Sequence, residues 1–345
     1  MGATERSVRL RHSDPAGPGI RRRRCGRGFR YLGAGDAPVR DPETLARIKA
    51  LVIPPAWEDV WICAEPGGHI QAVGTDSAGR RQYRYHDLWR ERRDRDKHDR
   101  VLEFGRVLPR LREEVSGHLG GRGLLAERVL AAAVRLIDLG FFRPGGEEYA
   151  ADNGTFGIAT IRREHVTCRR GELIFDYLAK GAKHREQALA DADVQAVVVG
   201  LKRRKGGDGL FAYRSGRGWH DVTAADINGY LAEATGGEFT AKDFRTWHAT
   251  VLAAVGLAVS EHAAGTAAAR KRAISRAVAE VAGYLGNTPA VARASYIDPR
   301  VIELYESGLT IAPALGDLGR NSEFGDLATR GAAERAVVRM LTRHG

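Results

Sequence analysis

Residues 141–165 read FFRPGGEEYAADNGTFGIATIRREH, and the pattern of the chain changes at this stretch. Before it, apolar residues recur at a spacing of 3.6 from Leu125 to Ile137, which predicts an amphipathic helix. After it, ELIFDYLAK (172–180) and HREQAL (184–189) alternate between apolar and polar residues and are separated by a glycine-containing turn. Helical patterns return beyond residue 220. A small sheet is therefore predicted inside a mainly helical region.

The N-terminal third has a different pattern. From 29 to 88 it shows short apolar runs broken by turn residues, with one helix expected near 42–51, which predicts a β-rich unit. The stretch RERRDRDKHDR (90–100) is dense in charges of both signs and is expected to be an exposed helix or linker at a domain boundary. Residues 1–28 lack apolar periodicity and include four consecutive arginines, which indicates a basic tail.

These patterns together predict an α+β fold. A basic flexible tail (1–28) precedes a small β-rich domain (29–95). A mainly α-helical domain with an inserted β-hairpin or three-stranded sheet follows (96–318), and a tail helix ends the chain (319–345).

The composition narrows the class of function. The 345 residues are 43% hydrophobic, so a core can form, and the formal net charge is +11. Such a charge attracts polyanions, because each phosphate that Lys or Arg neutralises releases counterions. No apolar run is long enough to span a bilayer, and no secretory signal is visible. The three cysteines are far apart and favour neither a disulfide framework nor a zinc site. A cytoplasmic protein without membrane contact is expected.

Four segments suit phosphodiester chemistry when they are taken together: 141–165, FDYLAKGAKH (175–184), FTAKDFRTWHAT (239–250) and VAGYLGNTPAVARASYID (281–298). A pentavalent phosphorane needs cations on its non-bridging oxygens, an in-line nucleophile and an acid for the departing 5′ oxygen. Arg143, Arg245 and Lys180 can supply the cations. Neither a phosphate-binding GxxxxGK[ST] loop nor a metal-ligand cluster is apparent, so no metal, nucleotide or other cofactor is expected.

The four segments resemble the type IB DNA topoisomerases, especially the compact bacterial and viral enzymes. The family's Arg–Tyr block is matched from Arg143 and Tyr149 to His165. Its K-D-x-R-T motif is matched by residues 242–246, and its G-H/N-T-P motif with a following tyrosine by 286–289 and Tyr296. The strand GRRQYRY (79–85) resembles the family's DNA-facing strand. The resemblance covers the chain from about Phe29 to Leu315.

The resemblance implies roles for individual residues. Tyr296 would be the nucleophile that forms a 3′-phosphotyrosyl bond, and Arg143 and Arg245 would hold the scissile phosphate. Lys180 would be the general acid, with Lys183 as the alternative because the glycine that precedes the family's lysine is alanine here. Asn287 would hydrogen-bond a non-bridging oxygen where many relatives have histidine. Further DNA contacts are implied for Gln82, Tyr83, Tyr85, Tyr149, Lys242 and Lys183.

The function implied is relaxation of supercoiled double-stranded DNA by a monomer that is associated with the nucleoid and needs neither ATP nor metal. The nearest alternative is a tyrosine recombinase, which shares this catalytic core. Recombinases usually carry a helical N-terminal domain and a histidine after the second arginine, whereas Arg245 is followed by Thr246. A non-enzymatic basic chromatin protein would have no need of the five catalytic residues.

Overall fold

The structure is a computed structural model that describes residues 9–344, apart from 147–153, 170, 262–264 and 318–328. The chain divides into two units, Met1–His98 and Asp99–Gly345. The helix α2 (Asp87–Leu119) runs through the division, within the charged stretch that the sequence marks as a boundary. None of the described helices is both long enough and apolar enough to cross a membrane.

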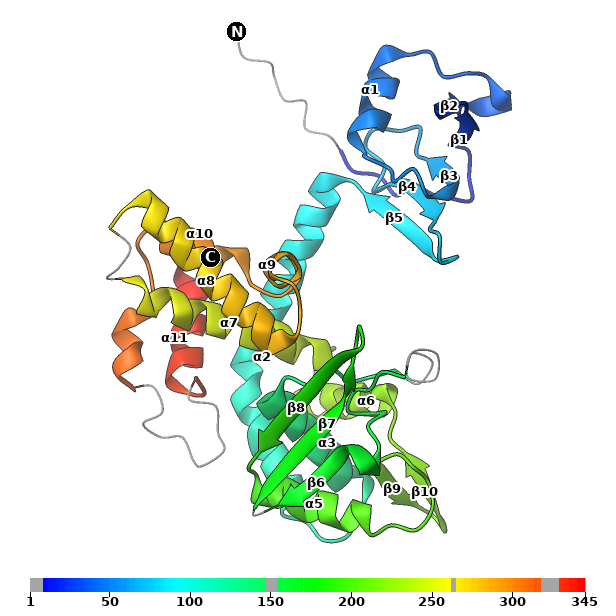
Figure 1. Cartoon of the computed structure of the whole chain (residues 1–345). Coiled ribbons are helices and arrows are strands. Elements are labelled where there is room, and N and C mark those ends of the chain that lie inside the picture. The colour runs from blue at the N-terminus through cyan, green and yellow to red at the C-terminus, as the bar shows by residue number, and fades with distance from the viewer. Residues whose placement is uncertain (1–8, 147–153, 170, 262–264, 318–328, 345) are drawn as a thin grey trace. The chain divides into compact units, whose positions relative to one another are not determined.

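The first unit is an antiparallel sheet covered by one helix (Figure 1). Its strands have the spatial order β2-β1-β3-β4-β5. Their bounds are Ile20–Cys25 for β1, Gly28–Leu32 for β2, Glu58–Ile62 for β3, Ile70–Thr75 for β4 and Arg81–Tyr85 for β5, with a short 3-10 turn η1 at Ala34–Asp36. The helix α1 (Pro42–Ala50) is capped by Asp41, which accepts a hydrogen bond from the Thr44 N–H. Its Ile48 packs into a small core with residues of β1, β3 and β4.

The prediction that residues 1–28 form a basic tail is wrong for the second half of this segment. Ile20–Cys25 forms β1, which lies inside the sheet between β2 and β3. Ile20 is buried in the core, and the Arg22 guanidinium, two residues on, lies 4.1 Å from the centre of the Phe29 ring. The inward side of β1 therefore carries an arginine as well as an apolar residue, which hides the alternation that normally marks a strand.

The second unit is mainly helical and contains a three-stranded antiparallel sheet and a separate hairpin (Figure 1). After α2 its helices are α3 (Ala126–Gly140), α5 (Ala192–Lys202), α6 (Ala224–Thr235), α7 (Ala241–Val259), α8 (Ala267–Leu285), α9 (Pro289–Ser295), α10 (Pro299–Glu306) and α11 (Ala332–His344), with 3-10 turns η2 (Arg163–His165) and η4 (Ala312–Asp317). The sheet has the order β6-β7-β8, with bounds Val166–Arg169, Glu172–Ala179 and Lys183–Leu189, and the hairpin pairs β9 (Ala212–Ser215) with β10 (Gly218–Asp221). The α+β prediction, with its β-rich first part and its sheet among helices, is confirmed.

The helix α3 lies at the centre of this unit. It contacts α5, α6, α7 and the strands β8 and β9, and its residues from Val129 to Gly140 are buried except Arg135. The predicted C-terminal helix exists as α11, but it is not a separate tail. Its Val337 and Leu341 belong to the same core as α3, because α11 is amphipathic and turns its apolar side inward.

Candidate active site

Five side chains proposed for catalysis line one cleft of about 670 Å³ in the second unit. They come from five separate segments: Arg143 follows α3, Lys180 follows β7, Arg245 lies on α7, Asn287 follows α8, and Tyr296 ends α9. Lys183 and Lys242 line the same cleft. Tyr149 lies outside the described residues. The fold thus gathers residues that are up to 153 positions apart in the sequence.

The segment around Arg143 is held by close backbone packing. Phe141 ends α3 in a left-handed conformation with φ 54°, and the chain then turns so that the Arg143 carbonyl accepts a hydrogen bond from the Ile158 N–H at 2.9 Å. A Cβ on Gly157 would lie 2.7 Å from the Arg143 oxygen and 2.6 Å from Gly145. Only glycine allows this approach, so Gly157 fixes the backbone beside Arg143.

Arg245 is 2% exposed and is fixed from two sides. Its two Nη atoms donate to the Phe141 carbonyl at 2.6 Å and to the Leu285 carbonyl at 2.8 Å. Burial and the nearby Arg143 lower the pKa of the Arg245 guanidinium to about 10, so it keeps its charge at neutral pH. The helix α7 begins in a capping box of Thr240 and Asp243, which fixes the first turn of the helix that carries Arg245.

Arg143 and Asn287 orient each other. The Arg143 Nη2 atom donates to Asn287 Oδ1 at 2.7 Å, which leaves the amide nitrogen as the free end of that side chain. Both Asn287 Nδ2 and Arg245 Nε are buried without a hydrogen-bond partner among the described residues. Because a buried donor without an acceptor is costly, two such donors beside a cationic cleft are suited to the oxygens of an anion.

Tyr296 ends α9 and is half-buried. The Arg245 guanidinium lies 5.5 Å from the centre of its ring. Burial alone would raise the pKa of the Tyr296 phenol, but the charges of Arg245 and Arg143 outweigh burial and lower it. The cationic groups of the cleft therefore make the phenolate, which is the nucleophilic form, easier to reach than it is for a tyrosine in water.

The two candidate acids lie on the β7–β8 hairpin. The turn between them contains Gly181 at φ 80° and Ala182 at φ 54°. Lys180 and Lys183 both line the cleft, and Lys183 Nζ donates to the Gly286 carbonyl at 3.3 Å. Lys183 is thus tied to the backbone next to Asn287. The choice of Lys180 as the acid stays a prediction.

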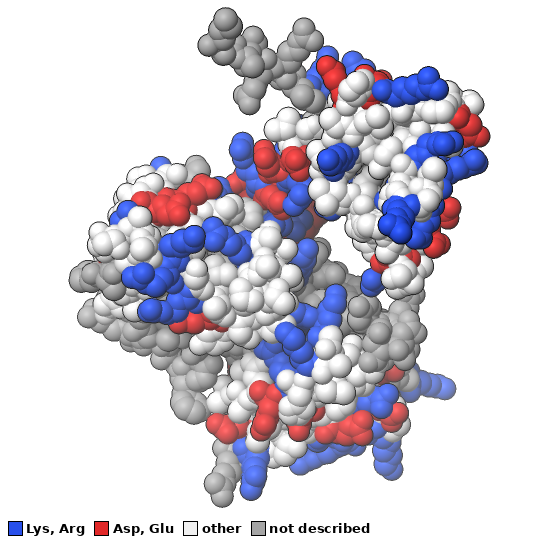
Figure 2. All heavy atoms as spheres, turned by 45° about the horizontal axis from the view of Figure 1, so that its top comes forward, with Lys and Arg blue, Asp and Glu red and all other residues white. Residues whose placement is uncertain are grey.

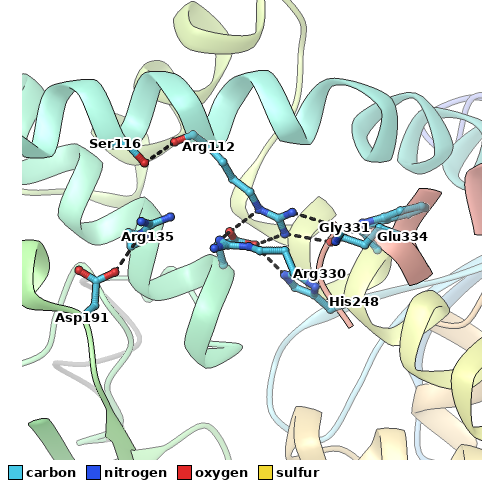
Figure 3. A network of polar contacts seen from close by, with 10 residues as sticks. Arg112, Ser116, Arg135, Asp191, His248, Arg330, Gly331 and Glu334 are labelled. Carbon is cyan, nitrogen blue, oxygen red and sulfur yellow. Dashed lines mark hydrogen bonds and ion pairs between the residues drawn. The ribbon is translucent and has the colours of Figure 1, made fainter. Parts of the chain in front are cut away.

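A buried polar network lies beside α7 and was not expected from the sequence (Figure 3). Asp138 of α3, 2% exposed, accepts hydrogen bonds from Arg112 of α2, His248 of α7 and Arg330. Arg112 also donates to both carboxylate oxygens of Glu334 on α11. Burial alone would raise the pKa of the Asp138 carboxyl, but Arg112 and His248 hold it well below its usual range. The network joins four helices, one of which carries Arg245.

The proposed DNA-facing residues of the first unit do not all share one side of the sheet. Tyr83 and Tyr85 alternate along β5, both exposed, with ring centres 6.0 Å apart. Gln82 lies between them and projects from the opposite face, where its Nε2 donates to Asp76 at 2.9 Å. The tyrosines can meet a ligand together, whereas Gln82 is held by the turn before β5.

Charge is distributed unevenly over the second unit. Figure 2 shows Lys and Arg side chains gathered in groups on the visible face of this unit, with acidic side chains at separate places. Among the described residues, no group of three or more His, Cys, Asp or Glu side chains is placed to hold a metal ion. The charged side chains that line the cleft are cationic as far as the described residues go.

Comparison with known proteins agrees with this geometry. Residues 86–309 match the family model of the eukaryotic DNA topoisomerase I catalytic core, and residues 28–76 match that of the bacterial DNA topoisomerase IB N-terminal domain. DNA topoisomerase 1B of Acanthamoeba polyphaga mimivirus is 30% identical over 297 residues, which are 84% of this chain and 88% of the viral protein. DNA topoisomerase 1 of Rabbit fibroma virus (strain Kasza) is 21% identical over 233 residues, 67% of this chain and 70% of the viral protein. The chain therefore belongs to the type IB DNA topoisomerase family.

Proposed function

We propose that this enzyme relaxes supercoiled duplex DNA by cutting and resealing one strand through a 3′-phosphotyrosyl bond to Tyr296. The observation that carries the proposal is the cleft itself. A phenol with a lowered pKa lies there beside the buried guanidinium of Arg245, the part-buried guanidinium of Arg143 and an amide N–H that has no partner among the described residues.

We assign one part of the cleavage reaction to each of the five side chains of the cleft. The Tyr296 oxygen attacks phosphorus while the bond from phosphorus to the 5′ oxygen breaks. Arg143 and Arg245 neutralise the charge that develops on the non-bridging oxygens, and Asn287 Nδ2 donates to one of them. Lys180 gives its proton to the departing 5′ oxygen, which would otherwise leave as a poor alkoxide.

Resealing reverses these steps. The 5′ hydroxyl returns its proton to the lysine and attacks phosphorus, and Tyr296 leaves. One phosphoester bond is exchanged for another, so the reaction needs no external energy source, and torsional strain in the DNA drives rotation between the two steps. We infer that the enzyme acts as a monomer on chromosomal DNA in the cytoplasm without metal or nucleotide.

The test is relaxation of supercoiled plasmid in EDTA without ATP. The wild-type protein should give a ladder of relaxed topoisomers and, when denatured during turnover, a covalent protein–DNA adduct. Tyr296→Phe should give neither product but should still bind duplex DNA, because the cations of the cleft remain. An adduct formed by Tyr296→Phe, or dependence of the wild-type enzyme on metal or ATP, would contradict the proposal.

A further inference from the structure

The β1–β2 hairpin of the first unit carries an unfavourable pair of charges. Arg23 of β1 lies directly opposite Arg30 of β2. Side chains opposite each other in antiparallel strands project from the same face, where like charges destabilise the pair. Arg21 projects from that face too, two residues before Arg23. All three arginines are exposed, and none makes a hydrogen bond or ion pair with another described residue.

The residue between them, Arg22, behaves differently. Its guanidinium lies over the Phe29 ring and donates to the Pro54 carbonyl at 3.1 Å. Burial lowers the pKa of this guanidinium. Arg22 therefore has a structural role inside the unit, whereas Arg21 and Arg23 project from the opposite face of β1.

Strand register places the outward arginines on the same face as the exposed tyrosines. Arg21 pairs with Trp61, Trp61 with Val73, and Val73 with Tyr83. Each of these pairs shares one face of the sheet, so Arg21 and Tyr83 project from the same side. The acidic residues Asp36 and Asp59 border the hollow beside Arg21, but no described ion pair joins either carboxylate to the hairpin.

The spacing of the strands fits a duplex. Three inter-strand steps separate β5 from β1, which is about 14 Å at about 4.8 Å per step. The major groove of B-DNA is about 12 Å wide. When β5 lies against this groove, β1 is therefore at the distance of the sugar–phosphate backbone that borders the groove.

We propose that Arg21, Arg23 and Arg30 form a second DNA contact, which binds the phosphate backbone beside the groove that β5 faces. This inference rests on the proposed function in one respect, that the substrate is duplex DNA, and it adds that the exposed tyrosines of β5 face that duplex. A polyanion supplies the countercharge that the hairpin lacks, so the Arg23–Arg30 pair is tolerable in the complex and unfavourable in the free protein.

The test compares two neighbouring arginines. Arg23→Gln and Arg24→Gln remove the same charge from adjacent exposed positions, but Arg24 projects from the other face of β1. Both changes are made in the full-length chain with Tyr296→Phe, and binding of a fluorescent duplex is measured over a range of salt concentrations. Losing one phosphate contact should reduce the salt slope by about 0.9, which is about eightfold weaker binding at 0.1 M salt. Arg24→Gln should leave the slope unchanged.

Thermal unfolding separates a binding role from a structural one. Arg23→Gln should keep or raise the Tm, because it removes a repulsion, while DNA binding weakens. Equal loss of binding in both variants would show that only net charge matters, and a lowered Tm for Arg23→Gln would show a structural role; either result overturns the proposal. Plasmid relaxation by the wild-type enzyme tests the proposed function separately, so each idea can fail alone.

Discussion

Glu334 offers a quantitative test of the buried network. It is 7% exposed, and each of its carboxylate oxygens accepts two hydrogen bonds. One oxygen accepts from Arg112 Nη2 and Trp247 Nε1, and the other accepts from Arg112 Nη1 and the Gly331 N–H. In Glu334→Gln one oxygen becomes an NH₂ group that can only donate. Whichever way the amide is turned, the two groups that donate to one carboxylate oxygen of Glu334 then face an NH₂ group, which cannot accept their hydrogen bonds.

The expected cost follows from these contacts. A hydrogen bond to a charged group contributes about 1.5–3 kcal/mol and a neutral one about 1 kcal/mol, and Arg112 also loses a buried countercharge. Breaking one side of a buried ion pair costs about 3–5 kcal/mol. For a unit of this size each kcal/mol lowers Tm by about 2–4 °C, so the Tm should fall by about 10 °C.

The assay is thermal unfolding followed by circular dichroism, with Glu303→Gln as the matched control. Glu303 is an exposed residue of α10, so the same change of charge and volume there should alter stability by less than about 0.5 kcal/mol. A Glu334→Gln protein that melts within about 2 °C of wild type at neutral pH would refute the reasoning, as would an equal loss in the control.

The remaining predictions concern chemistry and pH. Lys180→Ala should cleave ordinary DNA very slowly in single-turnover reactions. Its rate should be largely restored on DNA whose bridging 5′ oxygen is replaced by sulfur, because a thiolate leaves without a proton. If Lys183→Ala is the slow variant that sulfur restores, the general acid is Lys183. Arg143→Ala and Arg245→Ala should each slow cleavage by about 10²–10³-fold or more. Arg245→Ala should lower the Tm more than Arg143→Ala, since the Arg245 guanidinium is buried and donates to two backbone carbonyls at 2.6 and 2.8 Å, whereas Arg143 reaches one at 3.5 Å. A near-normal cleavage rate in either variant would remove that residue from the mechanism. Burial alone would raise the pKa of the Glu334 carboxyl, but the Arg112 guanidinium outweighs burial and lowers this pKa. The stability that the Glu334 carboxylate contributes is therefore present above about pH 4.5 and is lost as the pH falls further. Glu334→Gln should make the free energy of unfolding, measured by urea titration, fall less steeply with acid, and an unchanged slope against pH would contradict this prediction.

The candidate catalytic residues could be selected from the sequence because each lies in a short motif of fixed spacing. The structure places Arg143, Lys180, Arg245, Asn287 and Tyr296 around one cleft, although no two of them come from the same segment. The starts of α6 and α7 also carry a local signal, since a threonine three residues before an aspartate satisfies the first backbone donors.

What the sequence did not reveal depends on distant contacts. Residues 157–165 form a loop and the short helix η2, and the Gly157 backbone packs closely against Gly145, a contact that no local pattern marks. Asp138 lies in a largely apolar run, and its partners come from α2, from α7 and from the turn before α11. Gln82 belongs to a motif with two tyrosines, yet the pleat of β5 turns it away from them. The short hairpin β9–β10 was not predicted at all.

The place of α11 in the core has a consequence for biosynthesis. A ribosome makes this helix after every other described element of the second unit, at a rate of about 5–20 residues per second. Until it emerges, Arg112 lacks the Glu334 carboxylate, and the apolar sides of α7 and α10 that α11 covers stay open to water. The nascent chain therefore holds the candidate cleft in an unfinished core until α11 has been made.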